Sequence, residues 1–146
     1  MSYALSRLMS TATASYAGYC FARPEHLGQA MGASSGEQAG FDRLALVFGV
    51  RDAAISTFGI LGRSEHTVKT AMWIRIGCDV GDGIVLAAKA DDDATRTKIL
   101  ATTLGWGALN FLALAADRRR ARRVAAARAL AEQTSSAAKT VLHTLT

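Results

Sequence analysis

The segment at residues 72–88, MWIRIGCDVGDGIVLAA, constrains the fold more than any other part of the chain. It is about as long as a helix that crosses a bilayer, yet it carries Arg75, Asp79 and Asp82. At about 100° per residue, these three residues fall on one helical stripe with Leu86, while apolar side chains cover much of the remaining surface. Because an unpaired ion is costly in an apolar interior, the three charges need partners elsewhere in the protein.

The preceding apolar segment, residues 44–62, supplies those partners as Arg51 and Asp52. We expect Arg51 to pair with Asp79 or Asp82, and Arg75 to pair with Asp79 one helical turn away. A later apolar segment adds Thr103 and Asn110 on one face. The sequence therefore predicts an intramembrane polar cluster made of Arg51, Asp52, Arg75, Asp79, Asp82 and Asn110.

The rest of the chain is typical of an all-α protein. Pro24 is the single proline, and no segment alternates polar with β-branched residues. We predict a four-helix transmembrane bundle with up-down topology, whose helices span about residues 5–22, 44–62, 71–88 and 99–116. Polar connections at 25–42, 63–69 and 89–96 separate them, and the aspartates at 91–93 can cap the last helix. A basic helical tail, residues 117–146, follows this membrane domain of residues 1–116.

A soluble four-helix bundle is the main alternative. Five ionised groups in two helices would cost on the order of 12–17 kcal/mol in a bilayer if none were paired. A soluble core would also be destabilised by the same unpaired charges. Residues 99–116, however, contain no charged side chain, whereas a solvated surface helix shows one on nearly every turn. We therefore favour the membrane bundle, and keep as an alternative a soluble module that binds an acidic partner.

The charge distribution predicts the orientation. Most of the formal net charge of +5 comes from arginines that follow residue 117. By the positive-inside rule, this tail and the turn at 63–69 are cytoplasmic, so both termini lie inside. We expect the tail arginines to contact anionic lipid and leave nucleic acid as a less favoured partner, because aromatic residues are not interleaved with them. The predicted lipid contacts are Arg118, Arg119, Arg120, Arg122 and Arg123.

Two phrases carry a resemblance to a known family. FGVRDAAISTFGIL contains a G-x-R-D motif at Gly49, Arg51 and Asp52, and WIRIGCDVGDGIVL contains a D-x-x-D motif at Asp79 and Asp82. Ala22, Pro24, Leu27 and Gly28 precede both motifs. With these residues, the chain resembles the domain-of-unknown-function family four-two-six-seven, a family of small four-helix membrane proteins. The resemblance covers roughly residues 16–116. The resemblance implies a four-helix membrane architecture, and it implies no activity for this chain.

The chemistry of the cluster is open to two interpretations. In one, the ion pairs fix helix packing in a protein without enzymatic activity, whose partners are the lipid bilayer and another membrane protein or a second copy. In the other, Asp79 and Asp82 serve a small membrane enzyme or carrier that acts on a lipid-soluble substrate. No catalytic set can be named from the order of residues. No cofactor or metal is predicted, because the three histidines lie outside the apolar segments and no nucleotide-binding loop follows a strand.

Overall fold

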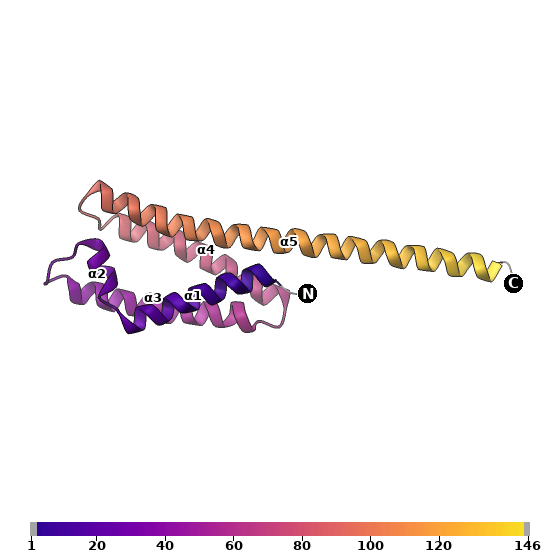
Figure 1. Ribbon diagram of the computed structural model, residues 1–146, viewed down its shortest axis with the longest axis horizontal. Helices are drawn as coiled ribbons and strands as arrows, with labels where there is room; N and C mark the ends of the chain where they lie inside the picture. The colour runs from indigo at the N-terminus through magenta and orange to yellow at the C-terminus, as the bar shows by residue number, and fades with distance from the viewer. Residues whose placement is uncertain (1–2, 145–146) are drawn as a thin grey trace.

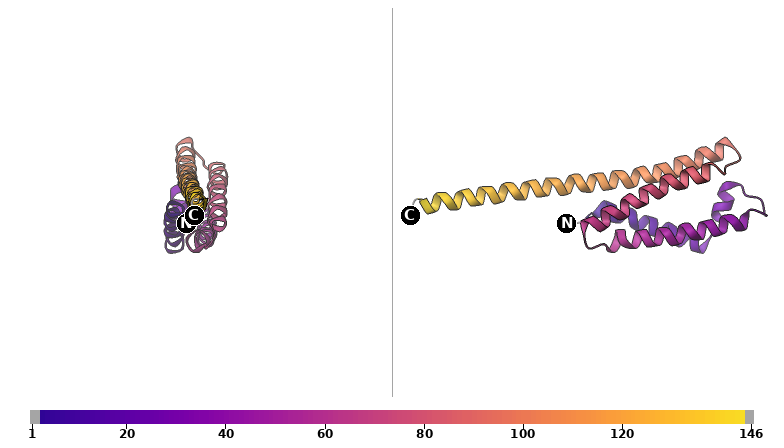
Figure 2. Two further views of the ribbon diagram at one scale, coloured as in Figure 1. Left: turned by 90° about the vertical axis from the view of Figure 1, so that its right-hand side faces the viewer. Right: turned by 180° about the vertical axis from the view of Figure 1, so that it is seen from behind.

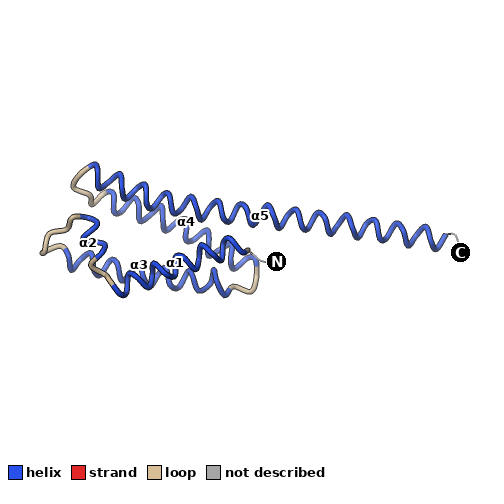
Figure 3. The backbone as a smooth tube through the Cα atoms, viewed as in Figure 1, coloured by secondary structure: helices blue, strands red, loops and turns tan. Residues whose placement is uncertain are grey.

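The computed structural model describes the backbone of residues 3–144 and the side chains of residues 3–136. Five helices follow one another: α1 (Ala4–Ala22), α2 (His26–Met31), α3 (Gln38–Leu61), α4 (Glu65–Ala87) and α5 (Asp93–Thr144) (Figures 1 and 3). The described residues contain no strand. The prediction of an all-α protein is confirmed.

The helices are longer than predicted, and one was not predicted. The expected connection at 25–42 contains α2 and the first turn of α3, and α4 and α5 each begin about six residues before the apolar segments that predicted them. The prediction had followed hydrophobicity alone. Polar residues continue a helix at its ends, where the backbone groups still form intrahelical hydrogen bonds.

Local chemistry explains where the helices begin and end. Pro24 follows the end of α1, and Gly32 ends α2 with a left-handed φ of 69° that glycine adopts without strain. The Ser64 hydroxyl accepts a hydrogen bond from the Thr67 amide at 3.0 Å and caps α4. Asp92 accepts one from the Thr95 amide at 2.8 Å in the first turn of α5. The predicted capping of this helix by an aspartate is confirmed.

The four long helices alternate in direction, so α1 and α4 run one way and α3 and α5 the other (Figure 1). Helix α1 packs on α3, and α4 packs on α5. The first turn of α1 and the α3–α4 turn lie at one end of the bundle, from which α5 also leaves (Figure 1). We call this the tail end. Helix α2 lies at the opposite end, where Leu27 and Met31 pack with Phe48 of α3 and Leu86 of α4.

Helix α5 continues far beyond the bundle as one straight rod (Figure 2). The described backbone shows no break at residue 117, where the sequence suggested that a separate tail begins. Asp117 is the last buried residue of α5 among those whose side chains are described. Its carboxylate accepts hydrogen bonds of 2.8 Å from both the amide and the hydroxyl of Ser6, so it satisfies donors in the first turn of α1.

Small residues line the contact between α1 and α3. The buried positions of α1 are Ser6, Ser10, Thr13, Ala17 and Cys20. A Cβ atom at Gly59 of α3 would collide with the Ser10 side chain, so the two backbones approach more closely than alanine would allow. This kind of contact is typical of helices that associate inside a membrane.

The large apolar side chains lie mostly on the outside. Leu8, Val50, Phe58, Ile84 and Leu112 are each more than half exposed. Two of the helices described, α3 and α5, contain stretches long and apolar enough to cross a membrane, each with a mean hydropathy of 1.6. Helices α1 and α4 do not meet this criterion, because α1 is rich in serine and threonine and α4 carries the charged stripe.

Candidate functional site

The polar cluster at the centre of the bundle begins with Arg51 of α3. Its two terminal nitrogens donate hydrogen bonds of 2.7 Å to the two carboxylate oxygens of Asp82 on α4. Its Nε donates to Oδ1 of the neighbouring Asp52 at 2.9 Å. This two-pronged contact fixes the position of α3 relative to α4, because the planar guanidinium matches the carboxylate in one orientation.

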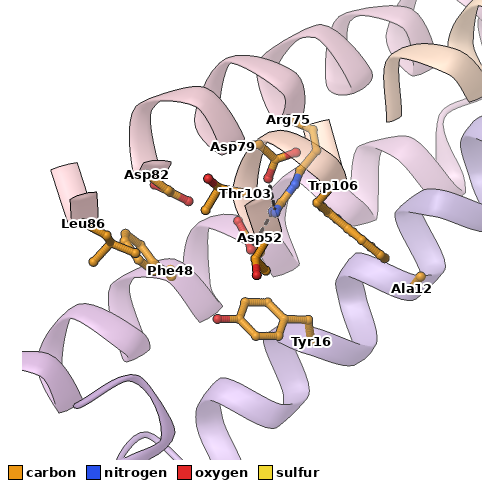
Figure 4. Close-up of a pocket in the computed structure, with 11 residues that line it drawn as sticks. Ala12, Tyr16, Phe48, Asp52, Arg75, Asp79, Asp82, Leu86, Thr103 and Trp106 are labelled. Carbon is orange, nitrogen blue, oxygen red and sulfur yellow. Dashed lines mark hydrogen bonds and ion pairs between the residues drawn. The ribbon is translucent and has the colours of Figure 1, made fainter. Parts of the chain in front are cut away.

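Arg75 of α4 occupies the deeper part of the cluster, with 6% of its surface exposed. Its Nη2 donates to Oδ1 of Asp79 at 2.5 Å. Its Nη1 lies 2.5 Å from Oδ2 of Asp52, an ion pair without the angular geometry of a hydrogen bond. Figure 4 shows Arg75 between the two carboxylates. Asp52 therefore bridges both arginines.

Asp79 is the third carboxylate of the cluster, and each of its two oxygens accepts one hydrogen bond. Its Oδ2 accepts one long hydrogen bond, 3.5 Å, from the Asn110 amide of α5, which donates a shorter one of 2.9 Å to the Trp106 carbonyl. Among the described residues, five buried side-chain atoms have no hydrogen-bond partner: Asp52 Oδ2, Ser56 Oγ, Arg75 Nε, Arg75 Nη1 and Asn110 Oδ1. Both oxygens of Asp82 are thus held by Arg51, whereas Oδ2 of Asp79 has only the long contact with Asn110.

A cavity of about 220 Å³ adjoins the cluster. Asp52, Arg75, Asp79 and Asp82 form its polar side (Figure 4). All four long helices contribute to the remaining wall, with Ala12, Tyr16, Phe48, Leu86, Thr102, Thr103 and Trp106. The side chains of Tyr16 and Thr102 are exposed, so the cavity opens sideways between α1 and α5.

The structure brings together all six residues of the predicted cluster. Of the two predicted partners of Arg51, Asp82 is the one it contacts, and Arg75 pairs with Asp79 one helical turn away as expected. Thr103 also lies at the cavity. The five arginines predicted to contact lipid lie elsewhere, in the first two turns of α5 beyond Asp117.

The geometry limits the chemistry. Both oxygens of Asp82 are occupied by Arg51, which leaves Asp79 as the one carboxylate of the predicted acid–base pair that is available to a ligand. Asp79 and Asp82 therefore do not present two unpaired carboxylates to a substrate for general acid–base catalysis. Within the described residues, no group of three or more His, Cys, Asp or Glu side chains is arranged to hold a metal ion.

Sequence reasoning did not assign Tyr16 or Phe48 to the site. Tyr16 lies in a serine- and threonine-rich segment whose face toward the bundle centre has no periodic apolar signal. Phe48 is one of many apolar residues in α3, and nothing in the sequence distinguishes it from the others. Their place at the cavity follows from how the helices pack, which local sequence does not encode.

The chain was compared with family models, curated proteins and solved structures. None of them matches it. The function must therefore be argued from the site itself.

Proposed function

We propose that this protein is an integral membrane bundle of four spans that binds a lipid-soluble ligand carrying one positive charge. The observation that supports the membrane position is the distribution of side chains between inside and outside. Small and polar residues, including Ser10, Asp52 and Asn110, are buried, while large apolar residues such as Leu8 and Phe58 face outward. In a water-soluble bundle the opposite distribution is favoured.

Helices α1 and α4 span together with the two apolar helices in this proposal. The charges of α4 do not oppose its insertion once α3 is present, because each arginine of the cluster is paired with two carboxylates. Alone, α4 would insert poorly. The basic tail end is cytoplasmic by the positive-inside rule, which places both termini inside. The resemblance to family four-two-six-seven agrees with this architecture.

The charge of the ligand follows from the cluster. Two arginines face three aspartates, so the site carries one excess negative charge when all five are ionised. Asp79 lines the cavity, and its Oδ2 has only the long contact with Asn110. Tyr16 and Trp106 line the same cavity, and aromatic faces attract organic cations. The third ring, that of Phe48, already has the Arg51 guanidinium 4.8 Å from its centroid. A primary or quaternary ammonium attached to an alkyl chain fits both features, with the chain leaving through the opening between α1 and α5.

The membrane part of the proposal is tested by fractionation. We expect the expressed chain to stay in the membrane pellet after washes with high salt and with alkaline carbonate. Release by salt alone would show that only the arginine tail touches lipid, and would favour a soluble bundle.

The ligand part is tested by fluorescence. The chain has two tryptophans, so a Trp73→Phe background leaves Trp106 as a reporter inside the cavity. In nanodiscs of phosphatidylcholine, we expect dodecylamine to change Trp106 emission saturably and dodecanol not to. Asp79→Asn should weaken the dodecylamine response by about tenfold, the effect of losing one partly buried counter-charge. Asp91→Asn, in the exposed loop, is the matched control. Equal responses to the amine and the alcohol would reject a cation site.

A further inference from the structure

A second hollow, of about 230 Å³, lies between α4 and α5 at the tail end of the bundle. Trp73 of α4 and Phe111 of α5 lie on its bundle side, and Arg118, Arg119 and Arg122 of α5 lie on its tail side. We call it the arginine groove. It shares no residue with the central cavity.

The aromatic side of the arginine groove is accessible. Trp73 and Phe111 are each 47% exposed, and their ring centroids lie 6.0 Å apart with an angle of 60° between the planes. The next residues in the sequence, Ile74 and Leu112, are apolar side chains that are at least half exposed. A tryptophan at the end of an apolar belt is typical of the interface between acyl chains and headgroups.

The arginine side is regularly spaced and unpaired. Residues 111, 115, 118, 119 and 122 follow one another at helical spacing, so their side chains form one face of α5 toward α4. Within residues 3–136, none of Arg118, Arg119 and Arg122 forms an ion pair. Glu65, which lines a neighbouring hollow with Arg118 and Arg122, is paired instead with Lys69 at 3.7 Å.

We propose that the arginine groove binds the phosphate of an anionic phospholipid, whose acyl chains run along Trp73 and Phe111. Three guanidinium groups without a carboxylate partner complement a phosphate, and the aromatic pair complements the chain just below the headgroup. A free phosphate would leave the aromatic side unused. The inference rests on the proposed membrane position of the bundle, but not on the central cavity.

The test uses Trp73 as a contact reporter. A Trp106→Phe background leaves Trp73 as the single tryptophan, and bromine atoms on an acyl chain quench a tryptophan that they touch. The full-length protein is placed in phosphatidylcholine nanodiscs that contain either brominated phosphatidylglycerol or the same amount of brominated phosphatidylcholine. Arg119→Gln with Arg122→Gln removes two groove arginines. Arg120→Gln with Arg123→Gln removes the same charge from neighbouring exposed positions that do not line the groove.

We expect Trp73 to be quenched preferentially by the anionic lipid. The groove pair of substitutions should lower this preference by about tenfold, and the control pair should lower it far less. Excess inorganic phosphate should not reverse the quenching. Equal quenching by both lipids, equal losses in the two double variants, or reversal by inorganic phosphate would each overturn the proposal. Because the signal comes from Trp73 and the compared substitutions lie in the tail, failure here is distinguishable from failure of the central cavity to bind an amine.

Discussion

Two sets of arginines in this protein meet opposite surroundings. Arg51 and Arg75 lie inside the bundle, and each contacts two carboxylates. Arg118, Arg119 and Arg122 lie where α5 leaves the bundle, and none of them forms an ion pair within residues 3–136. The first set forms ion pairs that join α3 to α4, whereas the guanidinium groups of the second set remain available to a ligand. The same residue type therefore has a packing role where it has carboxylate partners and a binding role where it has none.

The largest difference should come from Arg75. Arg75→Leu leaves Asp52 and Asp79 buried without their shared cation, so we expect the free energy of unfolding to fall by about 3–5 kcal/mol. Arg119→Leu, on the exposed side of the comparison, should change it by less than about 0.5 kcal/mol. Denaturant unfolding of both variants in the same detergent checks this. Similar losses would mean that the two sets of arginines are not distinct.

Asp117 separates the two regions and gives the next largest effect. Asp117→Ala removes the acceptor for the Ser6 amide and hydroxyl, and we expect a loss of about 2–3 kcal/mol because buried donors are left unpaired. The same unfolding measurement applies. Ser6→Ala combined with Asp117→Ala should cost less than the sum of the single changes, since the pair shares one interaction. If the loss of unfolding free energy in the double variant equalled the sum of the two single losses, the contact between Ser6 and Asp117 would be contradicted.

A smaller effect tests the geometry of the buried set. Arg51→Lys keeps the charge but cannot make the paired contact with both oxygens of Asp82, so we expect a loss of about 1–2 kcal/mol. Arg120→Lys, in the exposed tail, should have no measurable effect. If both substitutions were neutral, charge alone would account for the buried pairing.

The smallest effect concerns a carboxylate outside the bundle. Hydrogen bonds from Thr95 hold the pKa of Asp92 below its usual range of about 3.9. A lowered pKa in the folded state stabilises the fold above the ordinary value, and this contribution is lost as the pH falls through the lower, folded value. Asp92→Asn should therefore slightly flatten the acid limb of an unfolding-versus-pH curve, and Asp91→Asn is the control. An unchanged acid limb would show that the cap contributes nothing.

Helical periodicity was sufficient to find the centre of this protein. Arg75, Asp79 and Asp82 fall on one stripe in any α-helix, and an apolar surrounding forces them toward Arg51 and Asp52. The same argument placed Asn110 on a face that meets Asp79. These relations depend on spacing within a helix and on the cost of unpaired charge, both of which a sequence contains.

Features that depend on packing between helices were not predicted. Helix α2 has six residues, too few to show a period, and its position is set by Leu27 and Met31 packing at the end of the bundle. The arginine groove needs Trp73 of α4 beside Phe111 of α5, which local pattern does not reveal. The tail was predicted to be helical, but a boundary was drawn at residue 117 because hydrophobicity ends at residue 116; helix propensity, carried by alanine and arginine, continues.

The contact between Ser6 and Asp117 also bears on the order in which the chain is assembled. The two residues are 111 positions apart, so the amide in the first turn of α1 has no acceptor from α5 until nearly the whole bundle has been synthesised. The hydrogen bonds that join α1 to α5 at the tail end therefore form only after α5 has been synthesised as far as Asp117. A chain that ends before residue 117 lacks this acceptor, so the amide and the hydroxyl of Ser6 lose their partner.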